Sequence, residues 1–282
     1  MKKKCTLILS LLLVLALLCA CGGAAETGKT ENTENAQPVK IRVAASPTPH
    51  AEILAVAAEI LAQEGYELEI VEYDGYVQPN LVVDSGELDA NYFQHSPYLE
   101  SFNAENGTQI VSVGLIHYEP FGIYAGKTAS LEELPDGAEI IIPNDGSNET
   151  RALLLLQQEG LIKLADGINA SSNATVYDIA ENPKNLKITE MDAAQLARSR
   201  EDVDLAVING NFALAAGLNA SADALAIEDA SGDAAQTYAN LLGVKAGREN
   251  DPAIQALVKA LQSDAVRDYI NATYGGAVVP IF

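Results

Sequence analysis

The segment Asn91–Leu99, "NYFQHSPYL", gathers aromatic rings and a histidine in a chain that has only eleven Tyr, five Phe, three His and no Trp. In an extended strand, alternate side chains share one face of the sheet. An extended stretch over 90–95 therefore places Phe93 and His95 on one face with Asn91, and Tyr92 and Gln94 on the other. Phe93 and His95 can then line a pocket together, although a core strand that ends in a histidine has the same pattern.

Arg151 stands at the start of a strongly apolar run, "ETRALLLLQQEGLIKL" (149–164), which predicts a helix. A cation is mildly unfavourable at a helix N-terminus, because the helix dipole is positive there. An arginine beside the free amides of the first turn can instead bind a carboxylate through two hydrogen bonds. Asn148 and Asn209 carry amides that suit an ammonium or a carboxylate group. A solvated surface arginine and ordinary capping asparagines remain the alternatives.

The sequence gives little support to an enzyme. His50, His95 and His117 are the only histidines, and neither an H-E-x-x-H nor a G-x-S-x-G motif occurs. Acidic residues are so abundant that a pair of carboxylates carries no information. We therefore expect a binding protein without a metal or a cofactor, and a hydrolase that uses His95 or His117 is the remote alternative.

The first part of the chain reads as a strand, a helix and two further strands. Strands are expected over 39–46, 66–73 and 89–95, a helix over 46–65, and a short helix with a turn over 77–90. Apolar residues recur on one face of the longer helix, and Gly65 is a natural end for it. This order predicts an α/β domain with parallel strand pairing.

The second part repeats this alternation. Strands are expected over 138–144, 186–191 and 203–210, and one long terminal helix over 251–275. Two α/β lobes in tandem are the simplest account of the pattern. In such sheets, ligands bind at the carboxyl ends of the strands.

Residues 1–20 have the features of a secretory signal peptide. Three lysines precede an apolar run that is shorter than the roughly 20 residues of a membrane-spanning helix. The following "LCAC" resembles the lipobox of bacterial lipoproteins, in which the last cysteine, here Cys21, is acylated. Residues 21–38 are small and polar, so we expect a flexible tether.

The composition limits the partners and the stabilising chemistry. Cleavage before Cys21 would leave a single cysteine, which excludes an internal disulfide. The formal net charge is −22, and such a chain is repelled by nucleic acid and by anionic membrane surfaces. A lipid on Cys21 would nevertheless hold the protein at a membrane.

Long motifs in the chain resemble a known family. They are "YVQPN" (76–80), "ELDANYFQHSPYLESF" (87–102), "PNDGSNETRALLLLQQEGLIKL" (143–164), "AENPKNLKITEMDAAQLARS" (180–199), "DLAVINGNFALAAGL" (204–218) and "YGGAVVP" (274–280). They are similar to the methionine-binding lipoproteins of ABC importers, the MetQ/NlpA-like group of substrate-binding proteins. The resemblance covers essentially all of 39–282.

The resemblance implies a two-lobed α/β fold of the periplasmic-binding-protein type (type II), with the ligand in the cleft between the lobes. Lobe I would comprise 39–120 and be completed by 239–282, and lobe II would comprise 121–238. Two hinge strands would connect the lobes near 117–124 and 237–244. Closure on the ligand would then be a hinge motion.

The resemblance also implies roles for individual residues. Arg151 is similar to the carboxylate clamp of the family, with Asn148 beside it, and Asn209 and Asn240 to the groups that hold the ammonium and carboxylate. The wall around the thioether would comprise Tyr76, Phe93, His95 and Tyr124. Tyr92 and Tyr98 would be structural, whereas Tyr118 and Glu119 could modify the ammonium end.

The function that the resemblance implies is capture of L-methionine by a lipid-anchored protein on the extracytoplasmic face of the cell membrane. The ligand would pass to an ABC permease driven by a separate ATPase subunit. The clamp indicates an α-amino acid, and only the aromatic wall indicates methionine. The same fold binding a methionine-containing dipeptide or another amino acid is therefore the main alternative.

Overall fold

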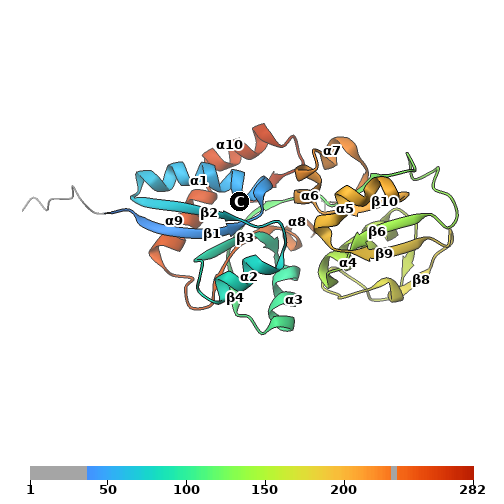
Figure 1. Cartoon of the computed structure of the whole chain (residues 1–282), viewed down its shortest axis with the longest axis horizontal. Helices are drawn as coiled ribbons and strands as arrows, with labels where there is room; N and C mark the ends of the chain where they lie inside the picture. Colours follow the sequence, from blue (N-terminus) through green and yellow to red (C-terminus); the bar gives the residue numbers. More distant parts are fainter. Residues whose placement is uncertain (1–36, 230–233) are drawn as a thin grey trace, which may run out of the picture. The chain divides into compact units, whose positions relative to one another are not determined.

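The computed structural model describes residues 37–229 and 234–282, and Gln37–Phe282 forms one compact unit (Figure 1). The predicted signal peptide and Cys21 lie outside the described residues, as does all of the predicted tether except its last two residues. The unit contains two main β-sheets and a small two-stranded one. This α/β architecture agrees with the predicted fold class.

The first sheet has six strands in the order β13-β4-β12-β3-β1-β2. They are β1 (Val39–Ala45), β2 (Tyr66–Glu72), β3 (Ala90–His95), β4 (Ile110–Tyr118), β12 (Asn240–Lys245) and β13 (Val279–Pro280). β1 pairs in parallel with β2 and β3, as predicted. β12 runs antiparallel between β3 and β4, so the C-terminal part of the chain completes this sheet.

Helices cover both faces of the first sheet. They are α1 (Glu52–Gln63), α2 (Val77–Asp84), α3 (Ser96–Asn106), α9 (Pro252–Leu261) and α10 (Asp264–Thr273), and an irregular helical turn, η1 (Pro47–Ala51), precedes α1. The alternation along β1 explains the layering, because Ile41 and Val43 pack against α1, α9 and α10 while Ala44 packs against α2 and α3. The helix predicted over 46–65 begins with η1 and continues as α1.

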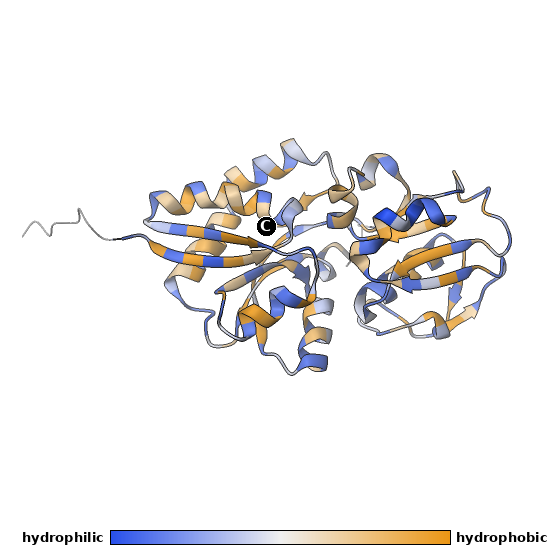
Figure 2. Cartoon of the chain, in the orientation of Figure 1, coloured by the Kyte–Doolittle hydropathy of each residue, from blue (hydrophilic) through white to orange (hydrophobic). Residues whose placement is uncertain are grey.

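The second sheet has five strands in the order β11-β5-β10-β6-β9. They are β5 (Gly122–Ala125), β6 (Glu139–Pro143), β9 (Lys187–Met191), β10 (Leu205–Ile208) and β11 (Ala224–Ile227). Figure 2 shows β6 and β10 as nearly continuous apolar strands. Parallel strands buried on both faces have this composition, and β10, β6 and β9 are paired in parallel.

The helices of the second sheet also form two layers. α4 (Gly146–Gln158) covers one face, and α5 (Ala193–Ser199) and α6 (Gly210–Ala215) cover the other. The smaller elements are β7 (Lys163–Leu164), η2 (Val176–Asp178), β8 (Ile179–Glu181), η3 (Arg200–Asp202), α7 (Ala220–Asp223) and α8 (Ala234–Thr237). The carboxyl ends of β6 and β10 lead directly into α4 and α6, and this connection positions the candidate site.

The chain passes twice between the two sheets. The first crossing, residues 119–121, joins β4 to β5, and the second crossing, residues 228–239, joins β11 to β12. The second crossing begins earlier in the chain than predicted and contains α8. The predicted lobe boundaries, with lobe I over 39–120 and 239–282 and lobe II over 121–238, stay a prediction.

The prediction of one long terminal helix over 251–275 is wrong. The segment forms α9 and α10, which both pack against α1. The break lies at Gln262 and Ser263, where the Ser263 hydroxyl accepts a hydrogen bond from the backbone N–H of Val266. A serine side chain that bonds the first turn starts a new helix, and this local capping overrides the continuous apolar pattern.

We predict that Ser263→Ala destabilises the protein, because α10 loses its N-cap acceptor. The free energy of unfolding should fall by about 0.5–2 kcal/mol. Urea denaturation followed by circular dichroism measures this change. Ser263→Asp is the matched control, since aspartate also caps helices, and it should keep near wild-type stability. Equal losses in both variants would show that the break depends on something other than the cap.

Candidate ligand-binding site

Residues at the end of β3, at the start of β12 and around the N-termini of α2, α4 and α6 line a pocket. Its lining residues are Tyr76, Phe93, Gln94, His95, Tyr98, Glu119, Asn148, Arg151, Asn209, Gly210, Asn211 and Asn240. A pocket lined by aromatic rings and a few convergent polar groups suits a small molecule.

The pocket contains every predicted binding residue except Tyr124. The others are Tyr76, Phe93, His95, Asn148, Arg151, Asn209 and Asn240. They come from distant parts of the sequence, which meet where β3 ends and β12 begins, beside the N-termini of α4 and α6. The geometry thus brings the predicted set together, and the role of each residue as a ligand contact stays a prediction.

Tyr124 does not line this pocket. It is fully buried in β5, on the face of the second sheet that α5 and α6 cover, where it packs against Ile141 and Leu196. Its ring folds back over Gly122, whose missing side chain leaves room for it. The family resemblance had assigned Tyr124 to the wall of the pocket, but its side chain points into the core between the second sheet and α5 and α6.

A β-bulge in β3 changes which residues face the pocket. In the pairing with β12, Tyr92 lies opposite Leu242 and Gln94 opposite Leu241, so Phe93 is the extra residue. A bulge interrupts the strict alternation of side chains and re-aims them. Gln94 therefore lines the pocket beside Phe93 and His95, which contradicts the predicted assignment of Gln94 to the opposite face.

Asn91 shares its side of β3 with the pocket residues but lies beneath them. Its amide bonds to Asn80 Oδ1 at 2.8 Å and receives a hydrogen bond from Gln94 Nε2 at 2.9 Å. Asn80 and Gln94 exchange a further pair of hydrogen bonds at 2.7 and 2.8 Å. This buried amide cluster is fully bonded, and it supports the floor of the pocket.

The N-terminus of α4 orients the polar groups of the pocket. Asp145 caps the helix by accepting a hydrogen bond from the backbone N–H of Asn148 at 3.0 Å. The same carboxyl accepts two hydrogen bonds from Asn148 Nδ2, so the amide oxygen of Asn148 faces away from it. This cap also makes α4 start at Gly146, earlier than the predicted 149.

The Asn148 amide oxygen then fixes two further side chains. It accepts hydrogen bonds from Asn209 Nδ2 at 2.9 Å and from His95 Nε2 at 3.1 Å. The other nitrogen of His95 accepts the backbone N–H of Tyr98, so the ring is held as the neutral Nε2–H tautomer. Burial and the charge of Arg151 lower the pKa of His95 to about 3, which agrees with a neutral ring.

Asn209 is left with a free acceptor. Because its Nδ2 group donates to Asn148, its Oδ1 atom points elsewhere, and this atom is buried without a hydrogen-bond partner among the described residues. An unpaired buried amide oxygen costs about 1–3 kcal/mol. A ligand N–H in the pocket would remove this cost.

Arg151 is buried and already has protein partners. Its Nε atom donates to Glu228 Oε2 at 2.9 Å, and its Nη2 atom donates to Glu228 Oε1 and to the carbonyl oxygen of Glu119. The guanidinium also lies 4.7 Å from the Phe121 ring and 4.2 Å from the Tyr238 ring. Burial alone would lower the pKa of Arg151, but the Glu228 carboxylate more than offsets it and raises the pKa.

Glu228 could not be recognised from the sequence as a partner for Arg151. Glu228 lies in the second crossing and also accepts hydrogen bonds from the Tyr118 hydroxyl at 2.6 Å and the Phe121 backbone N–H at 3.0 Å. Arg151 therefore has one free edge, since the described part of the chain offers its Nη1 atom no hydrogen-bond partner. Arg151 can donate to a ligand carboxylate only from that edge.

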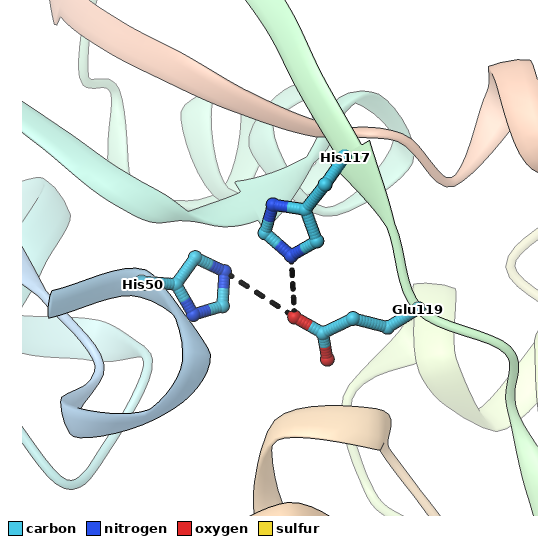
Figure 3. Close-up of side chains that lie close together, drawn as sticks. All are labelled: His50, His117 and Glu119. Atoms are coloured by element: carbon cyan, nitrogen blue, oxygen red, sulfur yellow. Dashed lines mark hydrogen bonds and ion pairs between the residues drawn. The ribbon is translucent and has the colours of Figure 1, made fainter. Parts of the chain in front are cut away.

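Glu119, in the first crossing, is surrounded by two buried histidines (Figure 3). His117 Nε2 lies 2.7 Å from Glu119 Oε1, and His50 Nε2 lies 3.5 Å from the same oxygen. Burial raises the pKa of Glu119, whereas His50, Arg151 and the backbone N–H of Asn211 act in the opposite direction. Gly210 makes this arrangement possible, since a Cβ atom there would lie 2.6 Å from the Cβ atom of Glu119.

The two histidines and Glu119 have the ligand types of a metal site, but their contacts are those of hydrogen bonds. His50 Nε2 lies 2.9 Å from Asn240 Oδ1, so this nitrogen faces two acceptor oxygens and carries the proton. The 2.7 Å between His117 Nε2 and Glu119 Oε1 is a hydrogen-bond distance. Burial lowers the pKa to about 4 for His50 and to about 3 for His117, so both are neutral.

Aromatic rings close the remaining side of the pocket. The Tyr76 ring lies 5.7 Å from Phe93, 5.6 Å from Tyr98 and 5.1 Å from Phe212. The Tyr76 hydroxyl donates to Asn211 Oδ1 at 2.6 Å, which connects the N-terminus of α2 to α6. Tyr98 lines the pocket as well as packing against Phe102, so its assignment as a purely structural residue was incomplete.

Sequence reasoning thus missed part of the lining. Gln94 was not predicted because a bulge cannot be recognised in the residue pattern. Gly210 was not predicted because the close approach of Glu119 to its backbone depends on the fold. Asn211 had a signal, since it follows a predicted strand, and polar residues at such strand ends are candidates for ligand contacts. Glu119 was among the residues expected to act at the ammonium end.

Comparison with known proteins decides the family. The family model of the NlpA lipoproteins matches residues 41–282, which is nearly the whole described chain. The chain belongs to the NlpA lipoprotein family. The NlpA lipoproteins are substrate-binding proteins, so this chain is not an enzyme.

Individual relatives agree with this membership. The methionine-binding lipoprotein MetQ of Bacillus subtilis is 40% identical over 96% of this chain and 97% of its own. A nutrient-binding protein from Burkholderia cenocepacia, solved bound to methionine, is 48% identical with a TM-score of 0.82, covering 86% of this chain and 100% of its own. A periplasmic substrate-binding protein of an ABC transporter from Coxiella burnetii is 42% identical with a TM-score of 0.80, covering 86% and 100%.

These matches confirm the predicted family and fold of this NlpA lipoprotein. Within residues 37–229 and 234–282, the structure has no helix that is both long and apolar enough to cross a membrane.

We predict that Glu228→Ala strongly destabilises this NlpA lipoprotein. Breaking a buried ion pair leaves an uncompensated charge, here on Arg151, and costs about 3–5 kcal/mol. Urea denaturation of the two proteins measures the loss. Glu181→Ala is the matched control, because Glu181 pairs with Lys163 at the surface, and loss of such a pair costs about 1 kcal/mol or less. A similar small effect in both variants would contradict the structural importance of the Arg151 pair.

Proposed function

We propose that this NlpA lipoprotein captures L-methionine and delivers it to an ABC permease that a separate ATPase subunit drives. The observation that carries the proposal is the set of polar groups in the pocket that can bind a ligand. These are the free edge of Arg151, the unpaired Oδ1 atom of Asn209 and the carboxyl group of Glu119. Together they complement the carboxylate and ammonium groups of an α-amino acid.

The two ends of the amino acid would bind at different groups. The ligand carboxylate would accept from Arg151 Nη1, as a charge-assisted hydrogen bond. The ligand ammonium would donate to Asn209 Oδ1 and to Glu119, both of which are acceptors. Asn240 would hold its place beside them through its hydrogen bond to His50.

The aromatic wall supports methionine as the side chain. Tyr76, Phe93, His95 and Tyr98 surround that side of the pocket. A thioether is flexible and polarisable, and its sulfur makes favourable contacts with the edges of aromatic rings. The methionine found in the Burkholderia relative supports the same choice.

Attachment and delivery complete the proposal. Acylation of Cys21 after removal of residues 1–20 would anchor the protein to the cell membrane on its extracytoplasmic face, with residues 21–38 as the tether. The lobes over 39–120 with 239–282 and over 121–238 would open and close about the two crossings. The relatedness to an ABC transporter binding protein supports delivery to a permease.

Two other ligands are consistent with the same fold. Relatives that are about 40% identical include proteins named for D-methionine. A methionine-containing dipeptide is the second alternative. A surface hydrolase that uses His95 or His117 is disfavoured by the family, and turnover of any ligand would be needed to revive it.

Native mass spectrometry of the soluble protein, before and after unfolding and refolding to remove ligand, tests the proposal directly. We expect a bound species with the mass of methionine, and the largest thermal shift with L-methionine among L- and D-amino acids and dipeptides, because a bound ligand stabilises the folded state. A shift only with D-methionine or with dipeptides would reassign the ligand. No bound mass and no shift would overturn the proposal.

We predict that Arg151→Ala loses most of the affinity for methionine, by about 2–5 kcal/mol, because the ligand carboxylate would be buried without its partner. Isothermal titration calorimetry measures the affinity. Arg198→Ala, an exposed arginine beside an adjacent groove, should bind like the wild type. Because Arg151→Ala also frees Glu228, the double variant Arg151→Ala/Glu228→Gln separates the effects: it should regain stability without regaining affinity. Wild-type affinity in either Arg151 variant would refute the clamp.

A further inference from the structure

The hydrogen bonds behind Glu119 continue away from the pocket into the first sheet. The hydroxyl of Tyr92 bonds to His117 Nδ1, and His117 Nε2 bonds to Glu119 Oε1. Tyr92 is fully buried in β3 and does not line the pocket. A tyrosine remote from the ligand is thus connected to a carboxyl group that faces it.

The partners of each atom assign the protons in this chain. The only hydrogen-bond partner of the Tyr92 hydroxyl among the described residues is His117 Nδ1, and burial raises the pKa of Tyr92 well above its ordinary value. Tyr92 therefore keeps its proton and donates it to Nδ1. The neutral His117 ring then carries its own proton on Nε2, where it can only be donated to Glu119.

The consequence falls on Glu119. A carboxyl oxygen that receives an N–H bond must act as an acceptor, which favours the ionised form. If Glu119 instead took up a proton and donated it to His117 Nε2, His117 would have to hold its proton on Nδ1, and the Tyr92 hydroxyl would lose its acceptor. Burial by itself favours the neutral acid, so the hydrogen bonds oppose it.

We propose that Tyr92 and His117 are positioning residues that keep Glu119 as a carboxylate, oriented toward the ammonium group of the ligand. The proposal rests on the proposed function, since it assigns Glu119 to the ammonium of an amino acid. It explains the three packed rings, because His50, Tyr92 and His117 lie edge to face with centroids 4.8 to 5.4 Å apart, which holds each donor in place. The device makes binding independent of pH near neutrality.

Among the described residues, no other group that faces Glu119 changes its charge near neutral pH. The titratable and charged groups that face it are His50 from η1, Tyr76 before α2, Tyr92 from β3, His117 from β4, Tyr124 from β5 and Arg151 from α4. Burial raises the pKa of each tyrosine, both histidines are already neutral, and Arg151 stays charged. A new pH dependence near neutrality in a variant would therefore report on Glu119.

The decisive experiment is calorimetric titration of L-methionine into the wild type and Tyr92→Phe at about pH 8 and about pH 6. In the variant, His117 is free to change tautomer and Glu119 can take up a proton. We expect its affinity to fall about tenfold for each pH unit below the new pKa, with about one proton released per methionine bound. The wild type should show a nearly flat profile and no proton release. A flat profile in Tyr92→Phe would overturn the proposal.

Two further variants separate this role from a merely structural one. Tyr124→Phe removes another buried hydroxyl, one without a partner, and should keep the flat profile. The double variant Tyr92→Phe/His117→Gln should have a flat pH profile again. A glutamine amide at position 117 donates an N–H to Glu119 and cannot change tautomer. If the double variant stays pH-dependent, the proton assignment is wrong. His117→Gln alone should also have a flat profile, and a pH-dependent profile in it would contradict the proton assignment even if Tyr92→Phe misfolds.

A readout without ligand separates this proposal from the proposed function. Carbon NMR of the Glu119 carboxyl, assigned with Glu119→Gln, should show titration at a higher pH in Tyr92→Phe than in the wild type. That shift would support the roles of Tyr92 and His117 even if methionine failed to bind. Failure to bind methionine would contradict only the proposed function. Added Zn²⁺ should not change the affinity for methionine. If Zn²⁺ lowers this affinity in the wild type but not in His117→Gln, the roles of Tyr92 and His117 are wrong and the residues form a metal site instead.

Discussion

The buried ion pair between Arg151 and Glu228 is the interaction on which the rest of the pocket depends. Arg151 belongs to α4 and Glu228 to the second crossing, while the Nη2 atom of Arg151 also reaches the carbonyl oxygen of Glu119 in the first crossing. One guanidinium therefore ties both connections between the sheets to the same helix. A buried ion pair offsets the cost of its desolvation only if further hydrogen bonds satisfy its other polar atoms. The Tyr118 hydroxyl and the Phe121 backbone N–H donate such hydrogen bonds to Glu228.

Satisfaction of those groups decides which atoms remain for a ligand. Arg151 keeps one edge because Glu228 occupies the other. Asn209 keeps its oxygen because Asn148 accepts its N–H, and Asn148 is turned that way because Asp145 caps α4. The atoms that can bind a ligand are thus those that the hydrogen bonds within the protein leave without a partner. This is why residues outside the lining, such as Asp145 and Glu228, control the chemistry within it.

The sequence predicted the elements well where a local signal existed. Alternation located the strands of 39–46, 66–73 and 186–191, and an unfavourable cation at a helix start drew attention to Arg151. It failed where the signal is not local. The bulge at Phe93 arises from pairing with β12, far along the chain, and Glu228 is distant in sequence from Arg151. Tyr124 was assigned to the pocket by family resemblance, and a resemblance of motifs does not fix the direction of a single side chain.

The balance of charge distinguishes Glu119 from Glu228 and Asp145, two other carboxyl groups close to the pocket. Glu228 is compensated by Arg151, and Asp145 by N–H and O–H donors, including those at the start of α4. Glu119 has only neutral histidines and a backbone N–H as direct donors to its carboxyl group, so its charge is stabilised without being cancelled. A ligand ammonium would complete it, whereas a ligand that carries only a carboxylate would add repulsion. If Glu119 is a carboxylate beside the free edge of Arg151, as we propose, the pocket would bind a zwitterion in preference to an anion of the same shape.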